Sequence, residues 1–464
     1  MERQVKQNVA PVGPKAETHE GGRADAFQRP LEELTRAVSA CLLFENTFYE
    51  SGTGIAERIA DLCGQVAPED VSKLAIRARH DLKLRHVPLW LCAQLAKRHR
   101  GRLVSDTIQA VIRRPDEMGE LIALYTGKKE RGKPAHLNRS LRKGIARAYP
   151  RFDAYQLGKW NRDAAVTLRD VMFLCHPKPK DEAQAAVWKA LIDKTLPAPD
   201  TWEVALSSGA DKQATWTRLL TPDETGRRKL PYMARLMNLR NQIDAQVDLG
   251  LIRQALLDGA EKSWALPFRF VTAAKHAPSL ADALNEAMLR AIQPEPNLPG
   301  MTYIILDVSG SMDDVLSAKS TMCRWEAASA LGVLLREVCE SCAVFTFSDQ
   351  IVEVPNHRGL PLVQSIGASQ SHRGTYLVKV LEVITAKRSK ATRAIVVTDE
   401  QTHDGLIPPP AERGYLINVG PYRPALETGK AWTRFTGWSE RIVDWVRIHE
   451  GIGLSASADD GTEA

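Results

Sequence analysis

Tyr303-Ile304-Ile305-Leu306-Asp307-Val308-Ser309-Gly310-Ser311-Met312 is the stretch from which the fold of this chain can be worked out. Its first four residues are apolar and predict a buried strand of a parallel sheet. The run then ends in Asp-x-Ser-x-Ser, which places a carboxylate and two hydroxyls at alternate positions of one loop. Ligands of open α/β sheets bind outside the carboxyl ends of the strands. Oxygen donors of this kind suit a hard divalent cation such as Mg²⁺.

An alternative is that Asp-Val-Ser-Gly-Ser forms only a turn, because these residue types are common in turns. Two later segments favour the ligand site. Residues 394–398 form a second apolar run that is followed by a carboxylate, and the polar loop 372–375 precedes a predicted helix. The pattern resembles the von Willebrand factor A (vWA) domain and its metal-ion-dependent adhesion site, or MIDAS. The resemblance implies that a divalent cation, Mg²⁺, is held by Asp307, Ser309, Ser311, Thr375 and Asp399.

Strands and helices alternate after residue 300, which predicts a doubly wound α/β domain over residues 301–452. The predicted strands are residues 303–306, 343–347, 351–354, 394–398 and 415–419, and the predicted helices are 324–338, 376–386 and 435–447. A Pro-rich linker at 293–300 separates this domain from the preceding part of the chain. The small and acidic residues 453–464 predict a mobile tail.

The N-terminal two thirds of the chain is predicted to be helical. Residues 1–26 are polar and aperiodic, which predicts disorder. Short amphipathic helices joined by polar or Pro-containing loops then follow from residue 27 to residue 292. Helices in such a series suggest an α-solenoid of HEAT type, although the sequence has no clean repeat period. The fold class expected is therefore α + α/β, with helical repeats followed by a vWA-type domain.

Charge is distributed unevenly over the 464 residues. The net charge is +6, but residues 97–180 contain 20 Lys and Arg against 8 Asp and Glu, so this segment carries +12 and the remainder −6. A basic segment within a folded protein favours a polyanionic partner. No apolar stretch approaches the ~20 residues of a membrane span, which indicates no membrane partner. Seven cysteines without zinc-like pairing, and an N-terminus without an apolar core, predict a cytoplasmic location.

Two basic segments carry the candidate binding chemistry. In the segment 136–149, Leu141, Ile145 and Ala148 share one face at helical spacing, and the other face is basic; it could be a solvated surface or a phosphate-binding one. The second segment contains Lys159 and Arg162 and continues to His176, which closes an apolar helix before a Pro-rich exit. His176 could simply cap helix carbonyls.

These segments resemble the TROVE module of the Ro 60 kDa autoantigen family, including its bacterial members. The resemblance lies in Leu-Arg-Lys-x-Ile-Ala-x-x-Tyr, in x-Leu-x-Asp-Val-x-x-Leu-x-His-Pro-Lys-Pro and in the order of the domains. It implies a monomeric ring of HEAT-like repeats closed by the vWA domain. Such rings bind Y RNAs outside and 3′ ends of misfolded RNAs through the central hole, in some bacteria with polynucleotide phosphorylase or another exonuclease. The implied RNA-binding residues are Lys159, Arg162 and His176, with Asp163 at the family position beside Arg162, and phosphate contacts from Arg139, Arg142, Lys143 and Arg147.

Two functions remain open at the level of sequence. The favoured one is a non-catalytic RNA-binding protein of RNA quality control or processing, because single-stranded ends can be bound by phosphate contacts and stacking without reading a sequence. The other is a protein–protein adaptor in which an α-solenoid carries a metal-dependent vWA ligand site. The basic excess at residues 97–180 separates the two, since an adaptor does not need it. No Ser-His-Asp arrangement, phosphate-binding Gly-rich loop or paired-carboxylate motif predicts an enzyme.

Overall fold

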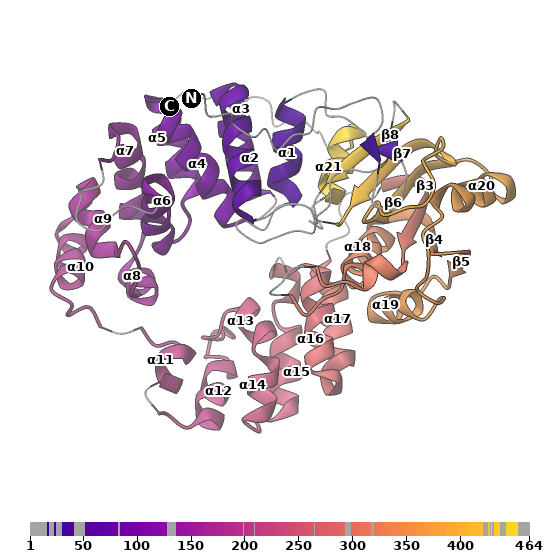
Figure 1. Ribbon diagram of the computed structural model, residues 1–464. Coiled ribbons are helices and arrows are strands. Elements are labelled where there is room, and N and C mark those ends of the chain that lie inside the picture. Colours follow the sequence, from indigo (N-terminus) through magenta and orange to yellow (C-terminus); the bar gives the residue numbers. More distant parts are fainter. Residues whose placement is uncertain are drawn as a thin grey trace, which may run out of the picture. The chain divides into compact units, whose positions relative to one another are not determined.

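A computed structural model of the chain divides into two compact units (Figure 1). The N-terminal unit comprises residues 29–46 and 50–230, and the C-terminal unit comprises 231–464 together with 1–28 and 47–49. The structure describes residues 16–17, 23–24, 30–40, 52–81, 84–127, 136–197, 199–207, 209–263, 265–292, 298–316, 320–420, 426, 428, 431–436 and 442–452. The predicted tail, 453–464, lies outside the described residues. In the described part of the chain, no helix is both long and apolar enough to cross a membrane.

Stacked helices make up the N-terminal unit. Each helix packs against the next one or the next but one, as in α3 with α4 and α5, and α5 with α7. This packing is that of an α-solenoid, in which short helices bury their apolar faces against neighbours in sequence. The helices are α1 (Pro30–Ala40), α2 (Gly52–Gln65), α3 (Pro68–His80), α4 (His86–Arg98), α5 (Arg102–Val111), α6 (Asp116–Thr126), α7 (Arg139–Ala148), α8 (Ala154–Trp160), α9 (Leu168–Cys175), α10 (Glu182–Ile192), α11 (Trp202–Ser207) and α12 (Lys212–Leu220), with the 3₁₀ turn η1 (Tyr149–Arg151) after α7.

The formation of α7 shows how sequence and packing agree locally. Asn138 caps the helix by accepting a 2.8 Å hydrogen bond from the backbone N–H of Leu141, as Asn commonly does at this position. Leu141 and Ile145 are fully buried. Gly144 lies between them and faces α5, where a Cβ would come within 2.8 Å of the Ile108 Cβ. The apolar face predicted from spacing is confirmed, and its glycine permits the close approach of α5 and α7.

Further helices begin the C-terminal unit and pack directly on its α/β part. They are α13 (Tyr232–Met237), α14 (Leu239–Asp244), α15 (Leu249–Leu257), α16 (Pro267–His276) and α17 (Ala281–Ala291), with the 3₁₀ turns η2 (Ala260–Lys262) and η3 (Pro278–Leu280). α16 packs against α18 (Arg324–Val338), and Asn285 of α17 accepts a 2.8 Å hydrogen bond from the backbone N–H of Leu360. The boundary between the two units therefore falls after residue 230 and not at the predicted linker 293–300, of which residues 293–297 lie outside the described part.

The α/β part is built on a sheet of strand order β5-β4-β3-β6-β7-β8. Neighbouring strands are parallel except for the antiparallel pair β4–β5. The chain passes from β3 to β4 on one side and later to β6 on the other, so β3 and β6 flank the point where the strand order reverses. The strands are β3 (Leu298–Asp307), β4 (Cys339–Phe347), β5 (Ile351–Val354), β6 (Ala391–Thr398), β7 (Ala411–Asn418) and β8 (Trp432–Thr436).

Helices cover both faces of this sheet (Figure 1). Tyr303 and Ile305 of β3 share a buried cluster with α20 (Leu377–Lys387). Leu306 points to the opposite face, where a Cβ on Gly332 of α18 would lie 2.8 Å from its Cδ1 atom. The alternation follows from the two-residue period of a strand. The remaining helices are α19 (Leu360–Gly367) and α21 (Ile442–His449), with the 3₁₀ turn η4 (Gly310–Asp313) directly after β3.

Four details of the fold differ from the expectations drawn from sequence. The predicted helix 435–447 is wrong at its start, because residues 432–436 form β8 and pair with β7, so the helix begins only at Ile442. Helix α19 was not predicted. Residues 298–300 of the predicted linker belong to β3, since Leu298 is buried and pairs with Cys339 of β4. Within the N-terminal segment 1–26, the described residues form two strands that were not predicted, β1 (Ala16–Glu17) and β2 (Arg23–Ala24), which pair antiparallel; its other residues lie outside the described part, and the disorder of the segment stays a prediction.

Candidate functional site

A cluster of carboxylates and hydroxyls forms where β3 and β6 end, and we call it the acid–hydroxyl cluster (Asp307, Ser309, Ser311, Thr375, Asp399). The Asp307 carboxylate accepts a 2.8 Å hydrogen bond from the backbone N–H of Ser309. The Ser309 and Ser311 hydroxyl oxygens are 3.3 Å apart. The Ser311 hydroxyl donates to the Asp399 carboxylate over 3.1 Å, which links the loop after β3 to the loop after β6. The two strands thus bring together residues that are far apart in sequence.

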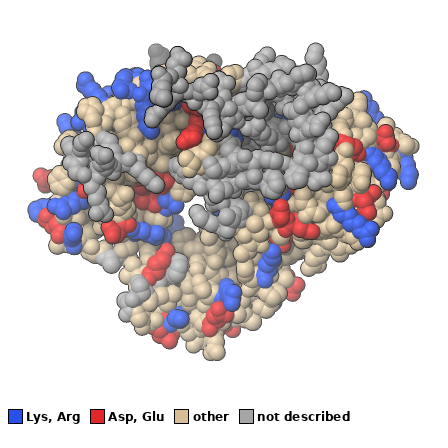
Figure 2. Space-filling view, in the orientation of Figure 1, with Lys and Arg blue, Asp and Glu red and all other residues tan. Residues whose placement is uncertain are grey.

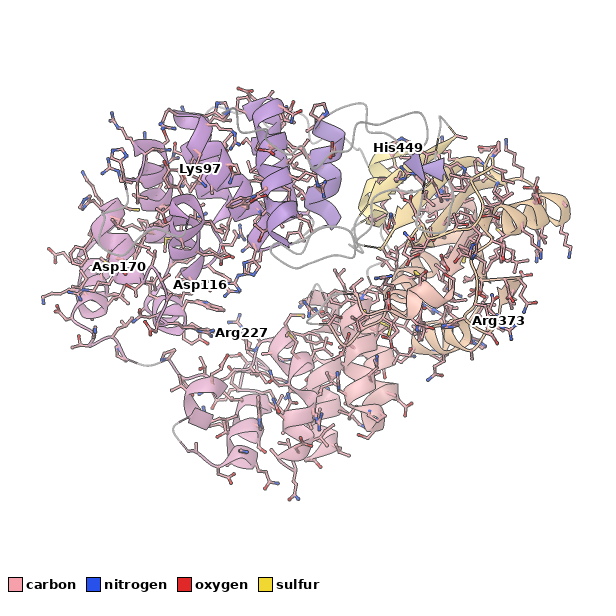
Figure 3. The ribbon with its side chains drawn as sticks, in the orientation of Figure 1. Lys97, Asp116, Asp170, Arg227, Arg373 and His449 are labelled. Atoms are coloured by element: carbon pink, nitrogen blue, oxygen red, sulfur yellow. The ribbon has the colours of Figure 1, made fainter. Side chains whose placement is uncertain are left out.

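Thr375 reaches this region on a third loop. The backbone N–H of Gly310 donates a 2.8 Å hydrogen bond to the carbonyl of Arg373, which ties the two loops together. Thr375 is buried, and its carbonyl accepts hydrogen bonds from the backbone N–H of His403 and the Thr402 hydroxyl at 3.0 and 3.2 Å. All five predicted residues therefore lie on three adjoining loops at one edge of the sheet. Arg373 is labelled in Figure 3.

Burial dominates the electrostatics of the cluster. Asp307 and Asp399 are both fully buried. Burial, and then the charge of Asp399, hold the pKa of Asp307 well above its usual range. Burial also raises the pKa of Asp399, although the nearby Arg324 guanidinium opposes this effect. The chain thus holds two carboxylates away from water, an arrangement that is costly unless cations or hydrogen bonds compensate.

The donor set fits a hard divalent cation. Two hydroxyls beside two carboxylates are oxygen ligands of the type that Mg²⁺ takes. Among the described residues, no three His, Cys, Asp or Glu side chains gather as a metal site, so a metal here would depend on the serine hydroxyls. When bound, such a cation would supply a positive charge that an acidic ligand could approach.

Two residues at the cluster were not predicted from the sequence. The Thr398 hydroxyl donates a 2.5 Å hydrogen bond to Asp307. Arg324 donates to Asp399 over 3.0 Å from the first residue of α18. Thr398 could have been found, because it is the last residue of the apolar run before Asp399. Arg324 gave no such signal, since a basic residue at a helix start is usually solvated and only the packing of α18 buries it.

The predicted basic helix is α7, and its charged residues lie on the exposed side. Arg139, Arg142, Lys143 and Arg147 are all exposed. Arg147 forms an ion pair with Asp106 of α5. Hydrogen bonds from Arg147 are the first cause that holds the pKa of the Asp106 carboxyl below its usual range. In the part of the chain that the structure describes, no carboxylate pairs with Arg139, Arg142 or Lys143, so three cations of this face remain available to a polyanion.

Lys159 and Arg162 come together around one aromatic ring. The Arg162 guanidinium carbon and the Lys159 Nζ lie 4.9 and 5.9 Å from the centroid of the Trp160 ring. Arg114 lies closer, at 3.4 Å, and two hydrogen bonds of 3.1 and 2.7 Å fix its guanidinium to Asp116, which is labelled in Figure 3. The ring is therefore held against a fixed cation, and two further cations lie near it. Neither Trp160 nor Arg114 was singled out from the sequence.

His176 follows the last residue of α9. A capping box between Thr167 and Asp170 begins this helix, and His176 ends it in the left-handed conformation, with φ of 51°. Its backbone N–H donates to the carbonyl of Met172 over 2.9 Å, while the side chain is exposed. The backbone of His176 therefore closes the helix, and the imidazole lies at the surface. α9 packs against α7, so His176 and the basic face belong to adjoining helices.

Basic side chains gather on the part of the N-terminal unit drawn at the upper left of Figure 2. This distribution agrees with the excess of +12 over residues 97–180. Acidic side chains interrupt it elsewhere on the same face of the molecule (Figure 2). The basic side chains of residues 97–180 thus lie mainly at the surface and not in the core.

Comparison with known proteins agrees with these features. Residues 34–195 match the family model of the TROVE domain, so the chain carries a TROVE domain and the resemblance noted in the sequence is confirmed. A similar solved structure is that of the RO (RSR) protein of Deinococcus radiodurans, with a TM-score of 0.59 and 17% identity over 90% of this chain and 98% of that chain. The predicted fold class, helical repeats followed by a vWA-type α/β domain, is confirmed by this likeness. None of the curated proteins compared with the chain matches it.

Proposed function

We propose that this protein is a non-catalytic RNA-binding protein of the Ro family that works in RNA quality control or processing. The TROVE domain at residues 34–195 supports the family. The observation that carries the RNA proposal is the exposed face of α7, where Arg139, Arg142 and Lys143 have no carboxylate partner among the described residues. Such a face binds phosphates with little demand on sequence.

The proposed ligands are Y-like RNAs on the basic outer surface and single-stranded 3′ ends of misfolded RNAs. Lys159 and Arg162 at the Trp160 ring, and the exposed His176, combine cations with flat rings. Cations attract the backbone and rings stack on unpaired bases, which is the chemistry of a site for single strands. A monomeric ring closed by the vWA domain, and an exonuclease partner such as polynucleotide phosphorylase, are part of the same proposal.

A binding experiment tests the RNA function. A labelled hairpin RNA with a single-stranded 3′ tail is compared with the hairpin alone, over a salt series. The variant Lys159→Ala/His176→Ala should weaken binding of the tailed RNA more than that of the hairpin. The control Lys387→Ala/His357→Ala changes the same residue types at exposed positions of the C-terminal unit and should bind as wild type. Absence of binding at low salt would contradict the proposal.

A second function is favoured by the acid–hydroxyl cluster. Because it has the donor set of a MIDAS, we propose that it holds Mg²⁺ and that an acidic side chain of a protein partner completes the coordination. In this adaptor function the basic surface would be incidental. The two functions differ in a simple experiment: an adaptor captures its partner in the presence of Mg²⁺ and loses it on substitution of Asp307→Ala, whereas RNA binding by α7 does not depend on either. Metal-dependent RNA cleavage that is abolished by Asp307→Ala would contradict the non-catalytic assignment.

A further inference from the structure

Arg324 is a buried cation within the acid–hydroxyl cluster. It is 5% exposed. One guanidinium nitrogen, Nη1, donates to the Asp399 carboxylate over 3.0 Å and to the carbonyl of Ser311 over 2.9 Å. The same nitrogen lies 3.4 Å from the more exposed carboxylate of Asp314. The cluster therefore already contains a positive charge that belongs to the chain itself.

The backbone on both sides fixes the position of this arginine. Its N–H donates to the carbonyl of Asp314 over 3.0 Å. It is the first residue of α18, which begins with a capping box in which Glu326 accepts a 2.8 Å hydrogen bond from the backbone N–H of Cys323. Lys275 of α16 holds the Glu326 carboxylate at 2.8 Å. α16 and the capping box thus hold the start of the helix and the backbone of Arg324, and the guanidinium itself is held by its hydrogen bonds to Ser311 and Asp399.

This placement has two opposite consequences for charge. Asp307 and Asp399 are buried, and removing buried carboxylates from water is unfavourable unless a cation compensates. Arg324 supplies one such charge in the absence of a metal. A divalent cation bound to the same carboxylates would be repelled by the guanidinium, and this repulsion is strong where water is excluded. The residue that stabilises the metal-free cluster thus opposes the metal.

We propose that Arg324 is a resident cation of the acid–hydroxyl cluster, which keeps the α/β part folded without a metal and lowers the affinity of the cluster for divalent cations. The inference rests on the proposed metal site. In this arrangement, metal binding requires the guanidinium to give up Asp399, and Asp314 lies within reach as its alternative partner. Metal occupancy is then set by competition between a side chain and an ion and not by the ligands alone.

The test measures Mn²⁺ binding by electron paramagnetic resonance of the free ion, on the full chain. Arg324→Gln should bind Mn²⁺ about tenfold more tightly than wild type, or better, because a nearby positive charge is removed. Arg336→Gln is the matched control: it removes the same charge from the last turn of the same helix, where Arg336 pairs with Asn356 and Glu337, and its affinity should equal that of wild type. Asp307→Ala should abolish binding in both backgrounds, which assigns the ion to the cluster.

Thermal unfolding supplies a second measurement. In a chelator, Arg324→Gln should unfold at a lower temperature than wild type, and Mg²⁺ should restore it, because a ligand stabilises the state that binds it. If the variant does not fold in the chelator, addition of Mg²⁺ should recover soluble protein. Arg324→Lys keeps the charge and should resemble wild type in both assays.

The outcomes separate this inference from the metal site on which it rests. Equal Mn²⁺ affinities of wild type and Arg324→Gln, or a weaker affinity of the variant, would overturn the role of Arg324 and leave the metal site standing. If Mg²⁺ does not raise the unfolding temperature of Arg324→Gln, the role of Arg324 is likewise overturned. Absence of Mn²⁺ binding in every variant would overturn both the metal site and the competition.

Discussion

Substitution of the free cations of α7 should change the salt dependence of RNA binding by a defined amount. The triple variant replaces Arg139, Arg142 and Lys143 by Ala. These residues are exposed and have no carboxylate partner among the described residues, so each can neutralise one phosphate. Alanine is a strong helix former, and the buried face of Leu141 and Ile145 is unchanged, so the helix should persist.

The size of the change follows from counterion release. Each phosphate contact contributes about 0.9 to the slope of log K against log salt on a duplex, and about 0.7 on a single strand. Three lost contacts should therefore reduce the slope by about 2 to 3. Arg147 provides an internal comparison, because its ion pair with Asp106 must be given up before it binds a phosphate. Arg147→Ala alone should change the slope by clearly less than Arg142→Ala.

The assay is fluorescence anisotropy of a labelled structured RNA between low and physiological salt, with helix content checked by circular dichroism. An unchanged slope in the folded triple variant would refute the assignment of α7 as a phosphate-binding face. An effect of Arg147→Ala as large as that of Arg142→Ala would contradict the expectation from ion pairing, even if the face itself binds RNA.

Three further predictions concern single residues. Trp160→Ala should weaken binding of an RNA with a single-stranded tail by about 1–3 kcal/mol and leave binding of the same RNA without the tail unchanged; equal losses for both RNAs would exclude stacking at this ring. Gly144→Ala should lower the thermal midpoint, with a cost of about 1–3 kcal/mol, because its Cβ would lie 2.8 Å from the Ile108 Cβ; a raised midpoint would show that helix propensity outweighs packing here. Glu450→Gln should destabilise the α/β part by about 3–5 kcal/mol, measured by urea unfolding at neutral pH. In wild type the Glu450 carboxylate lies 2.7 Å from the buried Arg393 guanidinium, and the substitution removes this charged partner. A loss below about 1 kcal/mol would contradict a strong buried pair.

The same ion pair sets a pH dependence with a definite sign. Burial alone would raise the pKa of Glu450, but hydrogen bonds from Arg393 and Tyr415 reverse this, so the pKa lies below its ordinary value of 4.5. A carboxyl group with a depressed pKa in the folded state contributes stability above its unfolded pKa, and this stability is lost as the pH falls through the folded pKa. Wild type should therefore lose stability in urea below about pH 4.5, and Glu450→Gln should lose less over the same range. Equal pH profiles would contradict the assignment.

Local sequence predicted parts of both sites, the acid–hydroxyl cluster and the basic face of α7. The apolar runs that end at Asp307 and at Asp399 placed both carboxylates correctly, because a buried parallel strand has a clear local pattern and its end carries the ligand. The exposed face of α7 was also predictable, since helical spacing separates Leu141 and Ile145 from the arginines. Helix 435–447 was misplaced at its start, because β8 acquires its strand conformation by pairing with β7 and not from its own pattern.

Short segments of sequence were enough to predict the order of helical and α/β parts and the basic helix, and the resemblance of three short segments to the vWA pattern pointed to the five residues of the acid–hydroxyl cluster. These features depend on local periodicity, on composition and on motif spacing, each of which is contained within a short segment. Packing between elements was needed to show that Arg324 lies buried against Asp399, that Arg114 stacks on Trp160 and that Arg147 is paired with Asp106. These contacts join residues from different elements. Whether a side chain is charged and free to bind a ligand depends on the groups that pack beside it, and a local sequence pattern does not contain this information.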